Sequence, residues 1–276
     1  MTFLRRWRAR TPFGSFSACA IVKAMPSDAP GVLPNPPAAV TFDCWSTLIA
    51  DVDGREAVRL RAAALIEIAG HRSVPLELDQ ARRLIDEAWL EHVAVWRRGG
   101  LFGPEGAARW ILDRLGIADG QGLTDELTWA IEGATSHVGV RMVEGAGEAL
   151  ELVRSRGIPT ALICDTGFTT GRSVRRALAT HGLTLDHLFF SDEVGTPKPH
   201  PPIFLAALEA TGAEPDRAVH IGDLRRTDVA GARAVGMGTI RFAGVHDDTW
   251  NDEDTAGDEA DAVLKRWADL GPVLGL

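Results

Sequence analysis

The sequence predicts an α/β fold in which a Rossmann-like parallel sheet carries an inserted α-helical subdomain. Three observations support this prediction. Short apolar runs alternate with helix-periodic stretches over the C-terminal half of the 276-residue chain, which is the pattern of strands joined by right-handed crossover helices. Acidic residues follow closely after several of the apolar runs. A separate block near residues 55–138 shows helical periodicity alone.

The first strand is predicted at residues 38–42, where a short apolar run ends abruptly in Asp43. A run without polar alternation is typical of a strand buried on both faces. Such a strand delivers the carboxylate to the carboxyl edge of the sheet, where ligands bind in open parallel sheets. Asp43 is therefore the first candidate functional residue.

A block of predicted helices follows this strand. Four segments have apolar residues at three-to-four spacing: residues 57–69, 78–96, 104–115 and 124–134. No strand pattern interrupts them. We therefore expect residues 55–139 to form a helical subdomain inserted into an α/β core made of residues 39–54 and 140–276.

Strand and helix patterns alternate after residue 145. The predicted strands are residues 160–163, 187–190, 218–221 and 238–242. The predicted helices are residues 145–156, 172–181, 201–211 and 228–235, and glycine follows the first two, as it often does at helix ends. A last helix is predicted at residues 262–269, after an acidic loop.

Residues 1–38 have the composition of an extension outside the fold. The basic residues that precede the first acidic residue, Asp28, are Arg5, Arg6, Arg8, Arg10 and Lys23. A proline-rich stretch follows. We interpret the segment as a disordered or leader extension. An export signal is the alternative, but its apolar stretch would be short and broken by glycine, serine and lysine.

Composition restricts the classes of function. The formal net charge of −9 and the pI near 5.4 disfavour a nucleic-acid partner. No run approaches the roughly 18 to 20 apolar residues of a membrane-spanning helix, so we expect no membrane partner. The three cysteines lack paired spacing, which favours a cytoplasmic location over a disulfide framework or a zinc site. The sequence carries no signal of oligomeric state.

Acidic, basic and hydroxyl or thiol groups follow four of the predicted strands. They centre on Asp43, Asp165, Lys198 and the pair Asp223 and Asp228. Because parallel strands end at one edge of the sheet, we expect these groups to cluster there. Clustered carboxylates repel each other unless a cation neutralises them, and oxygen ligands of this kind select Mg²⁺. Lysine is rare in this chain, which strengthens the case for Lys198.

The order and spacing of these segments resemble the four motifs of the haloacid dehalogenase superfamily, from about residue 40 to the C-terminus. The resemblance implies that Asp43 is a nucleophile and Lys198 a catalytic lysine. It implies a Mg²⁺ site made by Asp43, the backbone carbonyl of Trp45, Asp223 and Asp228. It also implies that the helical insert is a cap that shapes the pocket.

The resemblance places substrate-binding groups at Thr47 and in the second motif, at Cys164, Asp165 and Thr166. The family position for a Ser or Thr hydroxyl aligns with Cys164, whose thiol is a weaker donor, so Thr166 is the alternative. On the predicted cap helices, the candidates for contact with a small-molecule substrate are Trp89, Trp96, Arg97, Arg98 and Trp110.

Trp45 is the main departure from the family pattern. Phosphatases of the superfamily usually carry a second aspartate at this position, as a general acid and base. Indole cannot shuttle a proton, and general acid catalysis contributes about 10²- to 10⁴-fold in rate. We therefore expect a preference for phosphate esters whose leaving groups have a low pKa.

Three functions remain open on these residues. The leading hypothesis is a Mg²⁺-dependent phosphatase that acts on a small phosphorylated molecule through an aspartyl-phosphate intermediate. The second is a carbon–halide hydrolase resembling 2-haloacid dehalogenases, which Trp45 favours. Those enzymes use a tyrosine six residues after the lysine, however, where this tyrosine-free chain has Phe204. The third is a catalytically impaired binding protein, which Trp45 and Cys164 favour.

Overall fold

The computed structural model describes residues 33–118, 122–248 and 259–276. Most of the predicted N-terminal extension, residues 1–32, lies outside the described residues. In the described part of the chain, no helix combines the length and the apolar character needed to span a membrane.

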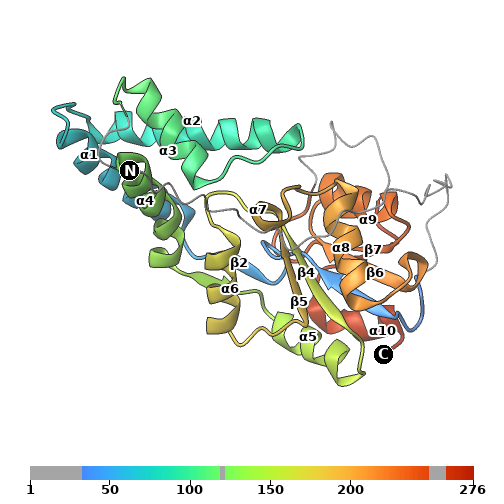
Figure 1. Cartoon of the computed structure of the whole chain (residues 1–276). Helices are drawn as coiled ribbons and strands as arrows, with labels where there is room; N and C mark the ends of the chain where they lie inside the picture. The colour runs from blue at the N-terminus through green and yellow to red at the C-terminus, as the bar shows by residue number, and fades with distance from the viewer. Residues whose placement is uncertain (1–32, 119–121, 249–258) are drawn as a thin grey trace, which may run out of the picture.

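A six-stranded parallel sheet forms the centre of the fold, which confirms the predicted α/β class (Figure 1). Its strands in spatial order are β5 (His187–Phe190), β4 (Thr160–Cys164), β1 (Ala39–Phe42), β6 (Ala218–Gly222), β7 (Gly238–Phe242) and β8 (Ala262–Leu264). The central strand β1 pairs with β4 and β6, and Phe42 lies opposite both Leu162 and Ile221. This register brings the ends of three motif-bearing strands together.

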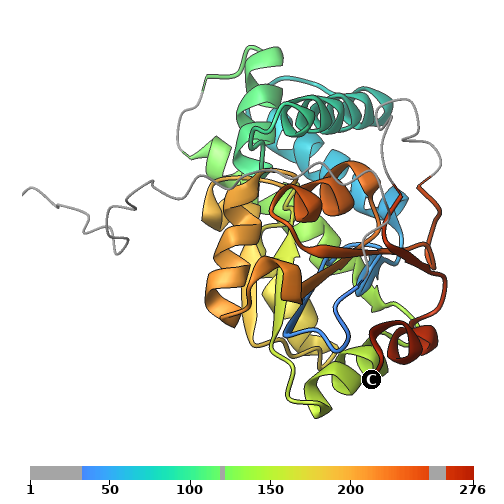
Figure 2. The same ribbon diagram turned by 90° about the vertical axis from the view of Figure 1, so that its right-hand side faces the viewer.

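Helices cover both faces of the sheet, which is why β1, β4 and β6 are buried along their whole length. Alternate residues of β1 point to opposite sides: Val40 and Phe42 join one apolar cluster, and Ala39 joins another. The first cluster includes residues of α5 (Ala146–Ser155), α6 (Gly171–Thr180) and α10 (Leu270–Leu274). The second includes residues of α8 (Pro201–Thr211) and α9 (Ala230–Ala234). Figure 2 shows α10 beside α5 at the bottom of the view, at one end of the sheet.

Four helices between β1 and β4 form a separate layer at the other end of the sheet (Figures 1 and 2). They are α1 (Gly54–Gly70), α2 (Leu78–Arg97), α3 (Pro104–Arg114) and α4 (Leu123–Val138), close to the four predicted helical segments. Asp53 caps α1 by accepting hydrogen bonds from the N–H groups of Arg55 and Glu56. The layer has its own apolar cluster, with Leu65, Ile111 and Leu127 fully buried.

A two-stranded antiparallel sheet joins this helical layer to the rest of the chain. It consists of β2 (Ile49–Asp51) and β3 (Val140–Met142), and it holds the entry and exit of the helical segment side by side. Neither strand was predicted, because three residues are too few to show a period of two.

The helix predicted at residues 262–269 is wrong. Strand β8 begins this segment and pairs with β7, so that Val263 lies opposite Arg241. A short 3₁₀ helix (Trp267–Asp269) and α10 follow. Trp267 is 2% exposed and stacks on Phe242 with ring centroids 4.5 Å apart. Pairing and packing with β7 thus override the local helical pattern.

Two smaller differences lie near the ends of strands. The helix predicted at residues 228–235 begins with a π-helical turn (Arg225–Val229), which continues into α9. A short helix, α7 (Ser191–Val194), follows β5 and was not predicted. Both elements lie where the chain leaves the carboxyl edge of the sheet.

Candidate active site

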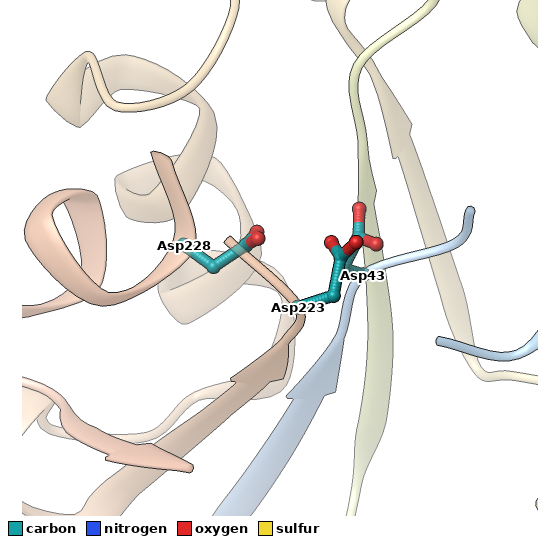
Figure 3. A group of neighbouring side chains, drawn as sticks. All are labelled: Asp43, Asp223 and Asp228. Atoms are coloured by element: carbon teal, nitrogen blue, oxygen red, sulfur yellow. The ribbon is translucent and has the colours of Figure 1, made fainter. Parts of the chain in front are cut away.

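Three aspartates meet at the carboxyl edge of the sheet (Figure 3). Asp43 follows β1, Asp223 follows β6, and Asp228 lies in the π-helical turn after β6. One carboxylate oxygen of each lies within 4.8 Å of the other two, and all three residues are buried. Burying three acidic groups this close is costly unless positive charge compensates them.

Lys198 supplies positive charge between two of these aspartates. Its Nζ donates to Oδ1 of Asp43 at 2.5 Å and to Oδ1 of Asp228 at 2.6 Å. The side chain is 3% exposed. The backbone N–H of Lys198 donates to Asp165 at 2.9 Å, which fixes the loop that carries the lysine.

The second oxygen of Asp43 is held by its own loop. The hydroxyl of Thr47 donates to Oδ2 of Asp43 at 3.0 Å. Two backbone N–H groups, of Leu48 and Ile49, donate to the carbonyl of Cys44 and close this turn tightly. Thr47 is fully buried and does not line the cavity described below, so the structure places it beside the predicted nucleophile.

Asp228 is the most heavily hydrogen-bonded member of the group. Besides Lys198, it accepts from Nε2 of His220 at 3.1 Å and from the N–H of Leu224 at 3.0 Å. Nδ1 of His220 lies 2.8 Å from the hydroxyl of Thr41. A Cβ at Gly222 would lie 2.3 Å from Cγ of Asp228, so only glycine fits before Asp223.

Burial and mutual repulsion shift the titration of these groups. Burial raises the pKa of Asp43 to about 8, against the attraction of Lys198, and it also raises the pKa of Asp223. Burial acts on Asp228 in the same sense, but Lys198 and the hydrogen bond from His220 hold its pKa below the ordinary value. The aspartates raise the pKa of Lys198 well above its ordinary value, in spite of its burial. Three acidic side chains therefore share one ammonium group, and the raised pKa values of Asp43 and Asp223 reflect this imbalance.

The three residues of the second motif, Cys164, Asp165 and Thr166, lie in three different environments. Cys164 is fully buried and lies outside the cavity lining. Asp165 accepts from Nε1 of Trp96 at 2.7 Å and from the N–H of Lys198, so both of its oxygens have partners. Thr166 lines the cavity, and its hydroxyl lies 3.0 Å from that of Ser191. Of the two positions considered for a hydroxyl donor, the structure brings Thr166 to the cavity.

A cavity of about 530 Å³ lies between the aspartates and the helical layer. On the sheet side it is lined by Asp43, Lys198, Asp223 and Asp228, together with Trp45, Phe168 and His246. On the helical side it is lined by Arg61, Trp89, His92 and Trp96, among others. Of the tryptophans proposed for substrate contact, Trp89 and Trp96 line the cavity and Trp110 does not.

Sequence reasoning did not find His246, His92 and Arg61, which all line the cavity. His246 follows β7, and its Nε2 donates to Oδ2 of Asp223 at 3.2 Å. His92 donates from Nδ1 to the carbonyl of Phe102 at 2.8 Å. Arg61 is 8% exposed. None of them lies in a motif, and an isolated histidine or arginine on a helix or loop carries no sequence signal of the cavity it faces.

A family model described as haloacid dehalogenase-like hydrolase matches residues 37–236, well over half of the chain. The chain belongs to the haloacid dehalogenase-like hydrolase family, which confirms the resemblance seen in the motifs.

The relatives that match by sequence cover only part of this chain. It is 36% identical over 107 residues to glyceraldehyde 3-phosphate phosphatase of Pyrococcus furiosus, a match that covers 37% of this chain and 42% of that protein. It is 34% identical over 131 residues to haloacid dehalogenase-like hydrolase domain-containing protein 3 of Mus musculus, covering 47% and 51%. It is 33% identical over 131 residues to ribulose-1,5-bisphosphate 5-phosphatase of Halopiger xanaduensis, covering 46% and 51%. The chain thus spans about half or less of the length of these relatives.

Solved structures agree on the fold. A HAD phosphatase from Thermococcus onnurineus is similar with a TM-score of 0.59 at 22% identity, covering 86% of this chain and 97% of that one. A 2-haloacid dehalogenase from Pseudomonas syringae is similar with a TM-score of 0.58, the same identity and the same coverage. Because a phosphatase and a dehalogenase resemble this chain equally well, the fold alone does not choose between the two reactions.

Proposed function

We propose that this hydrolase is a phosphatase that acts on a small phosphorylated molecule and uses Asp43 as its nucleophile. The observation that carries the proposal is the group formed by Asp43, Asp223, Asp228 and Lys198 at the sheet edge. The partial matches to relatives named as sugar-phosphate phosphatases support the same reaction.

The donor set of the site suits a magnesium ion. Three carboxylate oxygens within 4.8 Å of one another are hard ligands of the kind that Mg²⁺ prefers. Asp43, Asp223, Asp228 and the backbone carbonyl of Trp45 would hold the ion. When bound, Mg²⁺ offsets the negative charge of the phosphoryl oxygens and of the surrounding carboxylates.

The residues of this chain divide the work of the proposed reaction. The carboxylate of Asp43 attacks phosphorus, a phosphorus–oxygen bond forms to the aspartate, and the bond to the leaving alcohol or phenol breaks. Lys198 and Thr47 orient the carboxylate beforehand and Lys198 neutralises the transferring group. Water then hydrolyses the aspartyl phosphate, which restores Asp43 and releases inorganic phosphate.

A carbon–halide hydrolase is the second candidate, and Trp45 is the observation that favours it. Two features disfavour it. The three clustered carboxylates suit a bound cation, and hydrolysis of a carbon–halide bond needs none. Phe204, at the position where the dehalogenases have tyrosine, is fully buried against His220 and does not line the cavity.

The proposed function is tested by hydrolysis of p-nitrophenyl phosphate with added Mg²⁺ and with EDTA. We expect turnover that EDTA abolishes and that Asp43→Asn abolishes. Turnover that survives in Asp43→Asn would exclude Asp43 as the nucleophile. Absence of turnover, together with metal-independent halide release from a 2-haloacid, would instead establish the second candidate. Binding of Mg²⁺ without either activity would support the impaired binding protein.

A further inference from the structure

We infer that Arg61 forms a second anion site in the cavity and that the substrate is a phosphate ester carrying a carboxylate. The inference rests on the proposed function, because it assumes that the phosphate lies against Asp43 and Lys198. It adds the chemical class of the rest of the substrate.

The guanidinium group of Arg61 lies at the wall of the cavity. Its Cζ is 5.3 Å from the ring centre of Phe168, and its Nη2 donates to the hydroxyl of Thr135 at 2.8 Å. Phe168, Thr135 and Arg61 itself all line the cavity that contains Asp43. The charged end of Arg61 therefore contacts two other residues of the cavity wall.

Arg61 is a buried cation with unused hydrogen-bonding capacity. Nε donates to the carbonyl of Ile131 at 2.9 Å and Nη2 to Thr135, which leaves Nη1 without a hydrogen bond within the described residues. No carboxylate in that part of the chain lies within ion-pair distance of it. The carboxylate that acts on its charge is that of Asp51, an exposed residue that also lines the cavity. An unpaired charge that is 8% exposed is costly unless a ligand compensates it.

Burial lowers the pKa of Arg61 to about 10, so the group is still positively charged at neutral pH. The helical layer also contributes Trp89, His92 and Trp96 to the cavity wall. Burial lowers the pKa of His92, which keeps its ring neutral. Among the described residues of the helical layer that line the cavity, Arg61 is thus the one fixed positive charge.

The available atoms favour a carboxylate over a second phosphate. Nη1 is free to donate, and Nη2 keeps one N–H that Thr135 does not use, so the end of the guanidinium group can offer N–H donors to both oxygens of a carboxylate. One guanidinium charge, partly offset by Asp51, matches a group of charge −1 better than a phosphate of charge close to −2. A short phosphorylated acid would place its phosphate at Asp43 and its carboxylate at Arg61.

Arg61 also joins α1 to α4 through Ile131 and Thr135, so the test must separate binding from structure. We would measure binding by calorimetry in the Asp43→Asn protein with Mg²⁺, so that no turnover is needed. The ligands are phosphoglycolate and 2-hydroxyethyl phosphate, which differ by a carboxylate in place of a hydroxymethyl group. We expect phosphoglycolate to bind about 10- to 100-fold more tightly, the value of one hydrogen bond to a charged group.

Arg61→Met should remove this difference between the two ligands, and Arg61→Lys should keep part of it. Thr135→Val, which breaks the contact to α4 but keeps the charge, should retain the difference. Equal affinities in the parent protein, or a difference that survives in Arg61→Met, would overturn the inference. Tighter binding of ethylene glycol bisphosphate than of phosphoglycolate would overturn the assignment of a carboxylate. The comparison in the parent protein decides the matter even if Arg61→Met fails to fold. Failure of the proposed function would appear separately, as absent turnover of p-nitrophenyl phosphate.

Discussion

At the scale of single residues, Trp45 is the position where this site departs most from a phosphatase with a general acid. Trp45 lines the cavity two residues after Asp43, and its indole has no proton to give at the pH of the reaction. The groups that hold Asp43 itself are intact. We therefore expect the step that forms the aspartyl phosphate to depend on the stability of the departing alkoxide or phenolate.

Replacing Trp45 should change this dependence. Wild-type protein should hydrolyse aryl phosphates much faster than alkyl phosphates, and Trp45→Asp should raise the alkyl rate by about 10²-fold. Trp45→Asn is the matched control, because it has the size of aspartate without an acidic proton. Similar wild-type rates on both substrates, or an equal gain in the asparagine variant, would contradict a missing general acid.

At the scale of elements, polar contacts from α2 and α4 help to dock the helical layer on the rest of the chain. From α2, Trp96 donates to Asp165, which in turn holds the backbone of Lys198, and Arg226 lies over the indole at 4.0 Å. From α4, Glu132 accepts from residues at the start of α6. The position of the layer is thereby linked to the position of the predicted catalytic lysine.

Trp96→Phe removes the indole N–H while it keeps an aromatic ring against Arg226. The half-buried Asp165 then loses one of its donors, and the loop of Lys198 loses support. We expect kcat/KM for p-nitrophenyl phosphate to fall by about 10-fold, the value of one charged hydrogen bond. Steady-state kinetics would measure it. Trp110→Phe, on α3 and outside the cavity, is the control and should leave kcat/KM unchanged; an equal fall in both variants would contradict the link.

Glu132 should stabilise the protein in a pH-dependent way. It is 5% exposed and accepts from Thr170 at 2.5 Å, from Ser173 at 2.7 Å and from Arg172 at 2.9 Å. Burial opposes its ionisation, but these donors outweigh burial and lower its pKa below 4.5. A carboxyl group whose pKa is lowered on folding stabilises the native state above its unfolded pKa. That contribution disappears as the pH falls through the folded pKa.

Glu132→Gln should therefore lower the free energy of unfolding near neutral pH by about 1 to 3 kcal/mol. The difference from wild type should shrink as the pH falls below 4.5. Urea denaturation across this pH range would measure it. The exposed Glu105, which pairs with Arg109 on α3, provides the control variant Glu105→Gln. A difference that does not vary with pH would show that the charge of Glu132 is not what stabilises the contact.

Most of the larger helices and strands were predictable, because the spacing of apolar residues along each of them follows from the face that it buries. Strands β1, β4 and β6 are covered on both faces, so they appear as unbroken apolar runs. Strand β8 was not predictable, since its three residues are fixed by pairing with β7 and not by local preference. Strands β2 and β3 depend in the same way on each other.

At the scale of the whole molecule, the cavity lies where two apolar clusters meet, one beneath the sheet edge and one in the helical layer. The acidic half of the site could be predicted, because parallel strands must end at one edge and each motif follows a strand. The half of the site that the helical layer contributes could not be predicted. Arg61 and His92 reach the cavity through the docking of the helical layer, which no motif or spacing encodes.

The central claim is that Asp43 carries the phosphoryl group during turnover. The most direct measurement is to quench the protein with acid during hydrolysis of p-nitrophenyl phosphate and to analyse its peptides by mass spectrometry. We expect the peptide containing Asp43 to gain one phosphoryl group, labile to hydroxylamine, and the Asp43→Asn protein to gain none. Turnover without any phosphoryl group on this peptide, or the same gain in Asp43→Asn, would contradict the proposed mechanism.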